Sequence, residues 1–190
     1  METLTRRLVV SEYLSLDGVM EDPMWTAPYW SDELAAYKHD ELAAADALVL
    51  GRVTFEAFAE VWPTRSNDDP YTARINGLPK HVATATLDQS ALDQRSWNGH
   101  RLGGDVAGAI RALKEESGGD LLVFGSATLV RSLVREGLVD EYRLQVYPVV
   151  LGSGARLFGD EQASLELVEA RPFESGVTVL TYRPAVGAAA

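Results

Sequence analysis

The stretch that decides the fold is Leu121-Leu122-Val123-Phe124-Gly125-Ser126-Ala127-Thr128. Four consecutive apolar residues are typical of a short strand in the interior, and Gly-Ser then interrupts the run. The residues that follow place an apolar stripe on one face of a helix, formed by Leu129, Val130, Leu133 and Val134. The stretch therefore predicts a strand that passes through a glycine directly into a helix.

A second stretch has the same order, Leu48-Val49-Leu50-Gly51-Arg52-Val53-Thr54. In open α/β sheets ligands bind at the carboxyl ends of strands, where helix N-termini present free N–H groups to an anion and glycine permits close approach. Two such junctions can hold two parts of one polyanionic ligand, although each can equally be a simple turn. Neither matches the Rossmann glycine fingerprint or a P-loop, which argues against a standard dinucleotide or nucleoside-triphosphate fold.

Outward from these junctions, strand and helix patterns alternate along most of the chain. Further strands are predicted at 8–14, 79–86 and 100–102, and further helices begin at Ser31 and near Val106. The end is rich in strands, at 141–150, 165–170 and 177–182. Residues 19–30 and 64–77 are interpreted as loops, the second one flexible, and 87–99 as mostly turn. This order predicts an α/β fold: a mostly parallel sheet flanked by helices, with antiparallel strands at one edge.

Length and composition limit the classes of protein. The chain has 190 residues, a net charge of -11 and no cysteine, which indicates one domain over 1–184 with a disordered tail at 185–190. Without cysteine there is no disulfide scaffold, zinc ribbon or thiol nucleophile. The acidic balance disfavours nucleic acid as a partner. We see no signal peptide, membrane span or histidine spacing for a metal, so we expect a cytoplasmic protein without membrane contact or metal.

Arg52 is the most unusual of the charged candidates. It follows Gly51 at a helix start, where a cation opposes the helix dipole at a cost of a few tenths of a kcal/mol. An unfavourable placement of a cation without a compensating contact suggests that Arg52 binds a ligand, although a solvated arginine is the alternative.

Three acids and two tryptophans are further candidates. Asp17 lies in an Asp-Gly turn, and Asp32 with Glu33 opens a helix, so all three have ordinary structural roles. The functional alternative is a pocket carboxylate that bonds a heterocycle. Trp25 and Trp30 lie in an irregular stretch and serve either as core or as the wall of a pocket.

Six segments in register carry a resemblance to a known family. They are Ser15-Leu16-Asp17-Gly18, Gly51-Arg52-Val53-Thr54-Phe55-Glu56, Leu78-Pro79-Lys80, Phe124-Gly125-Ser126, Leu138-Val139-Asp140-Glu141-Tyr142 and Pro148-Val149-Val150-Leu151-Gly152-Ser153-Gly154. The chain resembles the dihydrofolate reductase-like superfamily from about Arg6 to Arg183. It resembles most closely stand-alone proteins similar to the C-terminal reductase domain of the bifunctional riboflavin-biosynthesis deaminase-reductase.

The resemblance implies a sheet of about eight strands with four helices, NADPH as cofactor and a homodimer. It implies that the phosphates at the adenosine end are held by Gly51, Arg52, Val53, Thr54 and Thr84. The pyrophosphate loop would comprise Gly125, Ser126, Ala127, Thr128 and Leu129. Asp17 and Gly18 would lie beside the nicotinamide, Glu33 or Asp32 would be the substrate carboxylate, and the substrate side would be bordered by Gly152, Ser153 and Gly154.

The implied function is an NADPH-dependent reductase that transfers a hydride to a small pterin- or pyrimidine-like heterocycle or another unsaturated compound. The alternative is a sensor that binds a pyridine nucleotide or a pterin-type ligand without turnover. The riboflavin reductase carries a lysine shortly before its Ser-Leu-Asp-Gly segment. In this chain Ser11 lies near that place, with Glu12 next to it.

Overall fold

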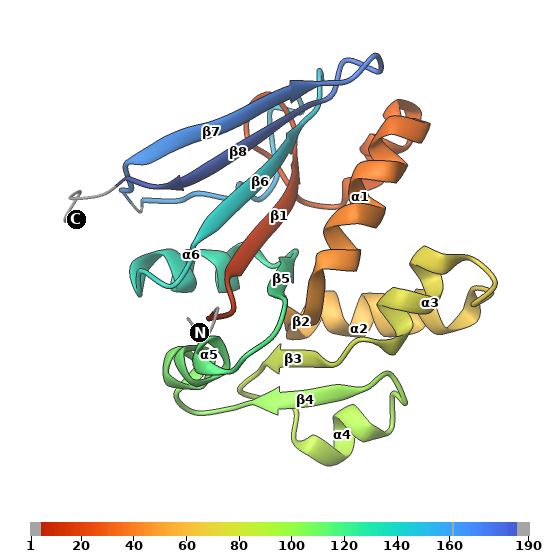
Figure 1. The fold of residues 1–190 in the computed structure, drawn as a ribbon, viewed down its shortest axis with the longest axis vertical. Helices are drawn as coiled ribbons and strands as arrows, with labels where there is room; N and C mark the ends of the chain where they lie inside the picture. The colour runs from red at the N-terminus through yellow and green to blue at the C-terminus, as the bar shows by residue number, and fades with distance from the viewer. Residues whose placement is uncertain (1–4, 161, 186–190) are drawn as a thin grey trace.

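The computed structural model describes residues 5–160 and 162–185 and contains one eight-stranded sheet (Figure 1). The strands are β1 (Leu8–Leu14), β2 (Ala45–Gly51), β3 (Lys80–Ala83), β4 (Gly99–Leu102), β5 (Asp120–Phe124), β6 (Glu141–Val146), β7 (Leu165–Pro172) and β8 (Thr178–Pro184). Their order is β4-β3-β2-β5-β1-β6-β8-β7. All pairs from β4 to β6 are parallel, whereas β8 and β7 join antiparallel at one edge. The predicted α/β class, mostly parallel with antiparallel C-terminal edge strands, is confirmed.

Helices cover both faces of the sheet, with α5 and α6 on one side of the strands and α1 to α3 on the other (Figure 1). They are α1 (Asp32–Ala44), α2 (Arg52–Val61), α3 (Pro70–Gly77), α4 (Gln89–Asp93), α5 (Val106–Glu115) and α6 (Ala127–Arg135), with 3₁₀ segments η1 (Pro23–Tyr29) and η2 (Trp62–Thr64). Within β1, Leu8 and Val10 pack into the cluster with α5 and α6, whereas Val9 packs into the cluster on the opposite face. This alternation explains why a strand buried on both faces is almost wholly apolar.

Three segments predicted as loops contain helices. The prediction of a flexible loop at 64–77 is wrong, because Asp69 caps α3 by accepting from Thr72 N at 2.8 Å and Pro70 stands at its first position. The prediction of turn at 87–99 missed the short α4, and the interpretation of 19–30 as loop missed η1. Both are too short for a periodic pattern to reveal them.

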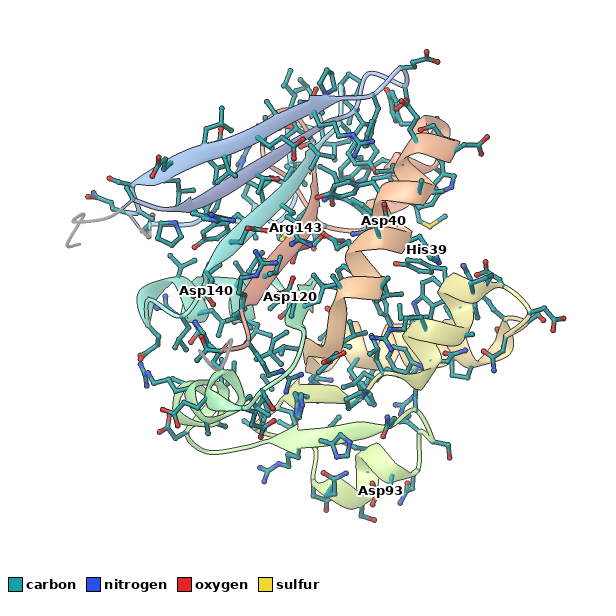
Figure 2. The ribbon with its side chains drawn as sticks, viewed as in Figure 1. His39, Asp40, Asp93, Asp120, Asp140 and Arg143 are labelled. Carbon is teal, nitrogen blue, oxygen red and sulfur yellow. The ribbon has the colours of Figure 1, made fainter. Side chains whose placement is uncertain are left out.

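Charged side chains gather at the amino ends of the central strands. Arg143 on β6 donates to Glu141 at 2.8 Å and lies 3.4 Å from Asp120 on β5, and Figure 2 labels Arg143 and Asp120 near the middle of the sheet. Arg7 completes the network through Asp120 at 2.7 Å. These pairs hold β5, β1 and β6 together at the end of the sheet opposite the two glycine junctions.

Two further predictions concern the C-terminal tail and membrane-spanning helices. Ala185 N donates to Ser164 O at 2.9 Å, and the rest of the predicted tail, residues 186–190, lies outside the described residues. Over 5–160 and 162–185, no helix has both the length and the apolar composition needed to cross a membrane.

Candidate functional site

The two strand–glycine–helix junctions meet. A Cβ atom on Gly51 would lie 2.6 Å from Ser126 Cβ, and a Cβ atom on Gly125 would lie 2.8 Å from Thr54 Oγ1. Each junction therefore needs a glycine so that the other can pack against it. Gly125 and Ser126 both have left-handed backbones, with φ of 66° and 67°. A non-glycine residue in this conformation is strained, and such strain clusters at functional sites.

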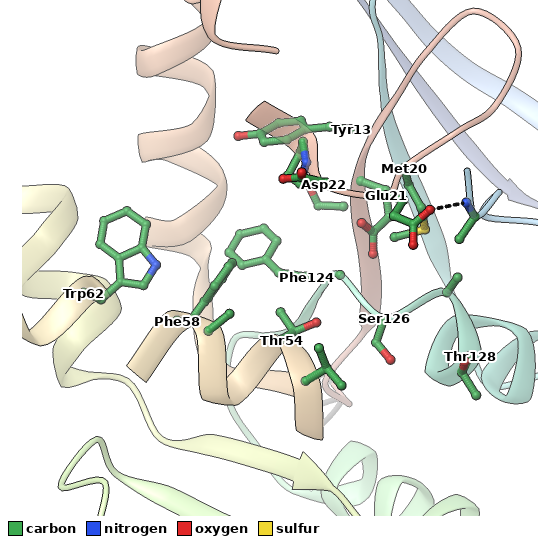
Figure 3. A pocket seen from close by; sticks show the side chains of 18 of the residues that line it. Tyr13, Met20, Glu21, Asp22, Thr54, Phe58, Trp62, Phe124, Ser126 and Thr128 are labelled. Atoms are coloured by element: carbon green, nitrogen blue, oxygen red, sulfur yellow. Dashed lines mark hydrogen bonds between the residues drawn. The ribbon is translucent and has the colours of Figure 1, made fainter. Parts of the chain in front are cut away.

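A cavity of about 710 Å³ opens at these junctions, along the carboxyl ends of β1, β2 and β5 (Figure 3). Its wall combines the junctions with the start of the loop after β1 and an apolar side from α2, η2 and α3. The lining residues are Ser11, Glu12, Tyr13, Met20, Glu21, Asp22, Pro23, Lys38, Val53, Thr54, Ala57, Phe58, Trp62, Tyr71, Ile75, Phe124, Gly125, Ser126, Ala127, Thr128 and Ala155. The cavity therefore joins two helix N-termini to an aromatic interior.

A buried lysine reaches the middle of β1 from α1. Lys38 is 3% exposed; its Nζ donates to Ser11 Oγ at 2.9 Å and pairs with Glu41. The same Nζ lies 4.5 Å from the ring centroid of Phe124. An ammonium thus lies at Ser11, and Glu41 balances its charge.

Glu12 is the second charged side chain on this strand. It is 5% exposed, and burial raises the pKa of its carboxyl to about 8 against the opposing effects of Lys38 and the Gly125 N–H. Its Oε1 is buried and has no hydrogen-bond partner among the described residues. The acid lies in the cavity wall without the paired environment that a buried carboxylate normally needs.

A second cavity of about 570 Å³ adjoins the first, because Tyr13, Lys38, Trp62 and Tyr71 line both. Trp30 and Arg65 also line it, and the Arg65 guanidinium stacks 4.4 Å from the Trp62 ring centroid. The predicted wall residue Trp30 thus faces a cavity. Trp25 instead packs against Tyr147, with ring centroids 5.4 Å apart, and donates from Nε1 to Glu21 O.

The three predicted catalytic acids lie outside both linings. Asp17 accepts from Leu151 N at 3.1 Å and Gly152 N at 2.9 Å. Bonds from the Ser15 hydroxyl and these N–H groups lower its pKa to about 2. It therefore joins the Ser-Leu-Asp-Gly turn to the 152–154 glycine loop. Asp32 and Glu33 are exposed on the first turn of α1, and Glu33 accepts from Glu174 N.

Some of the predicted cofactor residues line the first cavity and others lie outside it. The lining includes Val53, Thr54, Gly125, Ser126, Ala127 and Thr128. Gly51 and Leu129 lie outside the lining, where Gly51 packs against Ser126 and Leu129. Arg52 lies outside the lining at the start of α2 and pairs with Glu56 at 2.7 Å. Thr84 caps a turn by accepting from Leu87 N at 3.0 Å. On the predicted substrate side, Gly152 donates to Asp17, and Gly18, Gly152, Ser153 and Gly154 all lie outside the lining, whereas the adjacent Ala155 lines the cavity.

A comparison with protein-family models assigns this site to a family, because the RibD C-terminal domain matches residues 6–179. The chain belongs to the RibD C-terminal domain family. Its membership covers both glycine junctions and every residue of the cavity wall.

Known proteins are similar to this chain in sequence or in fold. The chain is 29% identical over 184 residues to "Uncharacterized protein YyaP" of Bacillus subtilis (strain 168), covering 93% of this chain and 94% of that one. A putative riboflavin biosynthesis protein from Shewanella sp. PV-4 superposes with a TM-score of 0.69 at 21% identity, over 94% and 99% of the two chains. A dihydrofolate reductase from Enterococcus faecalis, complexed with NADP(H) and RAB-propyl, superposes with a TM-score of 0.64 at 17% identity, over 94% and 96%.

Several residues of the site were not selected from the sequence as functional. They are Glu12, Lys38, Phe58, Trp62 and Tyr71. The acid in a mostly apolar strand was a usable signal for Glu12, since strands buried on both faces rarely contain one. Lys38 had no comparable signal, because a lysine on a helix is usually solvated.

Proposed function

We propose that the protein is an NADPH-dependent reductase that transfers a hydride to a small pterin- or pyrimidine-like heterocycle or a similar unsaturated compound. The observation that carries this proposal is the pair of interlocked glycine junctions, which open the N-termini of α2 and α6 onto one cavity. Free N–H groups at two adjacent helix starts suit a ligand with several phosphates. Membership of the RibD C-terminal domain family supports the same ligand.

The residues present fit NADPH on chemical grounds. The α6 N-terminus from Gly125 to Thr128 would hold the diphosphate with backbone N–H groups, and Thr54 would add a hydroxyl from α2. Arg52 would meet the 2′-phosphate once it leaves Glu56, since a guanidinium binds phosphate through paired hydrogen bonds. When bound, this cofactor supplies the hydride.

The remaining wall favours a flat, mostly apolar substrate. Phe58, Trp62, Tyr71 and Phe124 provide ring surfaces, and the second cavity extends the site toward Trp30. Aromatic rings bind planar heterocycles through stacked or edge contacts. Of the four residues that line both cavities, Lys38 is the one with a charged side chain, and its ammonium would orient a substrate acceptor. The chain's contribution is orientation and exclusion of water.

The cofactor part is tested with Val53→Asp. Val53 is 67% exposed and lines the cavity in the first turn of α2, where an acid stabilises the helix. The new carboxylate should weaken NADPH binding at least tenfold in calorimetric titrations without lowering the thermal stability. Val168→Asp, on the exposed edge strand β7, adds the same charge away from the cavity and should bind as the wild type does. Equal NADPH affinities in the wild type, Val53→Asp and Val168→Asp would show that the cofactor does not bind in this cavity.

Turnover is tested by following NADPH oxidation with a panel of pterins, pyrimidines and other unsaturated heterocycles. Cofactor carrying deuterium at the transferred position should give a product heavier by one mass unit than the product from ordinary cofactor. Tight NADPH binding without oxidation across the panel would favour the sensor alternative.

A further inference from the structure

Glu12 lies on the face of β1 that points toward α6. Alternation along the strand places it with Leu8 and Val10, which pack against the α5 and α6 side of the sheet. In the cavity wall it accompanies Gly125 to Thr128, the junction that starts α6. The acid therefore stands beside the helix N-terminus that suits an anionic ligand.

The hydrogen bonding of Glu12 is incomplete. The Gly125 N–H favours the ionised form of its carboxyl, while Oε1 is buried and has no hydrogen-bond partner among the described residues. An ionised carboxylate would leave that oxygen desolvated and unpaired, which is costly. A neutral carboxyl instead carries one O–H donor that can bond a ligand oxygen in the cavity.

Charged and titratable groups from several elements face this part of the cavity. Lys38 on α1 favours the ionised form of Glu12, and Glu41 on the same helix opposes it. The loop after β1 adds Glu21 and Asp22 to the lining, and α3 adds the Tyr71 hydroxyl. Because Glu41 balances Lys38, the net field of these neighbours is acidic.

We propose that Glu12 binds the dinucleotide as a neutral carboxylic acid, donating a hydrogen bond to its anionic part at the start of α6, so that binding takes up one proton whenever Glu12 is ionised beforehand. This inference rests on the proposed function. It makes Glu12 a ligand-binding residue whose neutral form allows a polyanion to bind at an acidic wall.

The coupling has a definite size. With a pKa of about 8 in the free protein, Glu12 is mostly neutral at pH 7 and mostly ionised at pH 9. An anion beside it favours the neutral form, and by reciprocity the neutral form favours the anion. If only the neutral form binds, the apparent affinity falls about tenfold between pH 7 and pH 9, because each pH unit above the pKa costs a factor of ten.

The experiment is calorimetric titration of the full chain with NADPH at pH 7, 8 and 9, in pairs of buffers with different ionisation enthalpies. The wild type should take up close to one proton per NADPH at pH 9 and little at pH 7, with affinity about tenfold weaker at pH 9. Glu12→Gln should keep the pH 7 affinity within a few-fold, take up no proton and lose the pH dependence. Glu21→Gln removes an acid from the same lining and should retain both effects.

A readout that needs no folded variant comes from ¹³C NMR of wild-type protein labelled at glutamate carboxyls. Adding NADPH at pH 9 should move one glutamate resonance from the ionised to the neutral position. Binding at pH 9 without proton uptake, or a Glu12→Gln variant with the wild-type pH profile, overturns the inference. No NADPH binding by the wild type at any of these pH values overturns the proposed function and this inference with it.

Discussion

Gly125→Ala tests the contact between the two glycine junctions. Gly125 has a φ of 66°, and a Cβ atom there would lie 2.8 Å from Thr54 Oγ1 and 2.9 Å from Thr54 Cγ2. Alanine therefore introduces both a strained backbone and a steric overlap. Gly137, at the end of α6, has a nearly identical φ of 61° with nothing within 4 Å of a new Cβ atom.

The cost of the strained backbone and the cost of the steric overlap can be separated by comparing these variants. A left-handed backbone costs an L-residue roughly 1–2 kcal/mol, so Gly137→Ala should lower the free energy of unfolding by about that amount. Overpacking adds roughly 1–3 kcal/mol, so Gly125→Ala should cost about 2–5 kcal/mol. Thr54→Ala removes the overlapping Oγ1 and Cγ2 atoms. In the double variant, the steric part should be recovered as a coupling of about 1–3 kcal/mol.

Urea unfolding of the wild type, Gly125→Ala, Gly137→Ala, Thr54→Ala and the Gly125→Ala/Thr54→Ala double variant measures these free energies. Calorimetric titration with NADPH, at temperatures where each protein is folded, separates stability from binding. Equal losses for Gly125→Ala and Gly137→Ala, with no coupling to Thr54, would refute the interlocking of the junctions. The cavity geometry that depends on this interlocking would be refuted too.

Three further outcomes are expected. Arg52→Ala should weaken NADPH binding about ten- to a hundred-fold while leaving NADH almost unchanged, because hydrogen bonds to charged groups contribute about 1.5–3 kcal/mol each; parallel losses for both nucleotides would contradict this role. Lys80 is fully buried, which lowers its pKa to about 7. Between pH 7 and 9 the Lys80 side chain is therefore protonated in the unfolded chain and neutral in the folded one. Over this range the wild-type free energy of unfolding, measured in urea, should rise relative to that of Lys80→Met by roughly 2 kcal/mol. No relative change would mean that Lys80 stays charged in the folded protein. Asp17→Ala should speed hydrogen exchange at the Leu151 and Gly152 amides, because their N–H groups donate to the Asp17 carboxylate; unchanged protection there would show that other contacts hold this loop.

The fold was predictable where local patterns and tertiary demands agree. Residues 121–124 and 8–14 are buried on both faces, so their apolar runs needed no knowledge of their neighbours. The start of α1 was equally clear, since Ser31 accepts from Leu34 N as the sequence indicated. The segment 64–77 failed because its polar composition outweighed the Asp69-Pro70 helix start.

The site was predictable only where it is local. Both junctions were identified from the sequence, and the structure brings them together. The aromatic wall was not identified, because Phe58, Trp62 and Tyr71 come from three consecutive elements, one of which was interpreted as a loop. Acids in turns and helix starts were selected as pocket carboxylates, whereas the acids that line the cavity are Glu12 in β1 and Glu21 and Asp22 in the loop after it.

The charges of the wall determine how an anion can bind there. Its charged side chains are Glu12, Glu21, Asp22 and Lys38, and Glu41 balances the lysine. In a chain of net charge -11 this wall repels phosphate, and it repels phosphate less when Glu12 is neutral. Attraction must then come chiefly from the N–H groups at the starts of α2 and α6, with Arg52 reaching one end of the ligand. Partly buried dipoles are screened less by salt than exposed cations are. Affinity in this site should therefore depend weakly on ionic strength and strongly on the backbone geometry that Gly51 and Gly125 maintain.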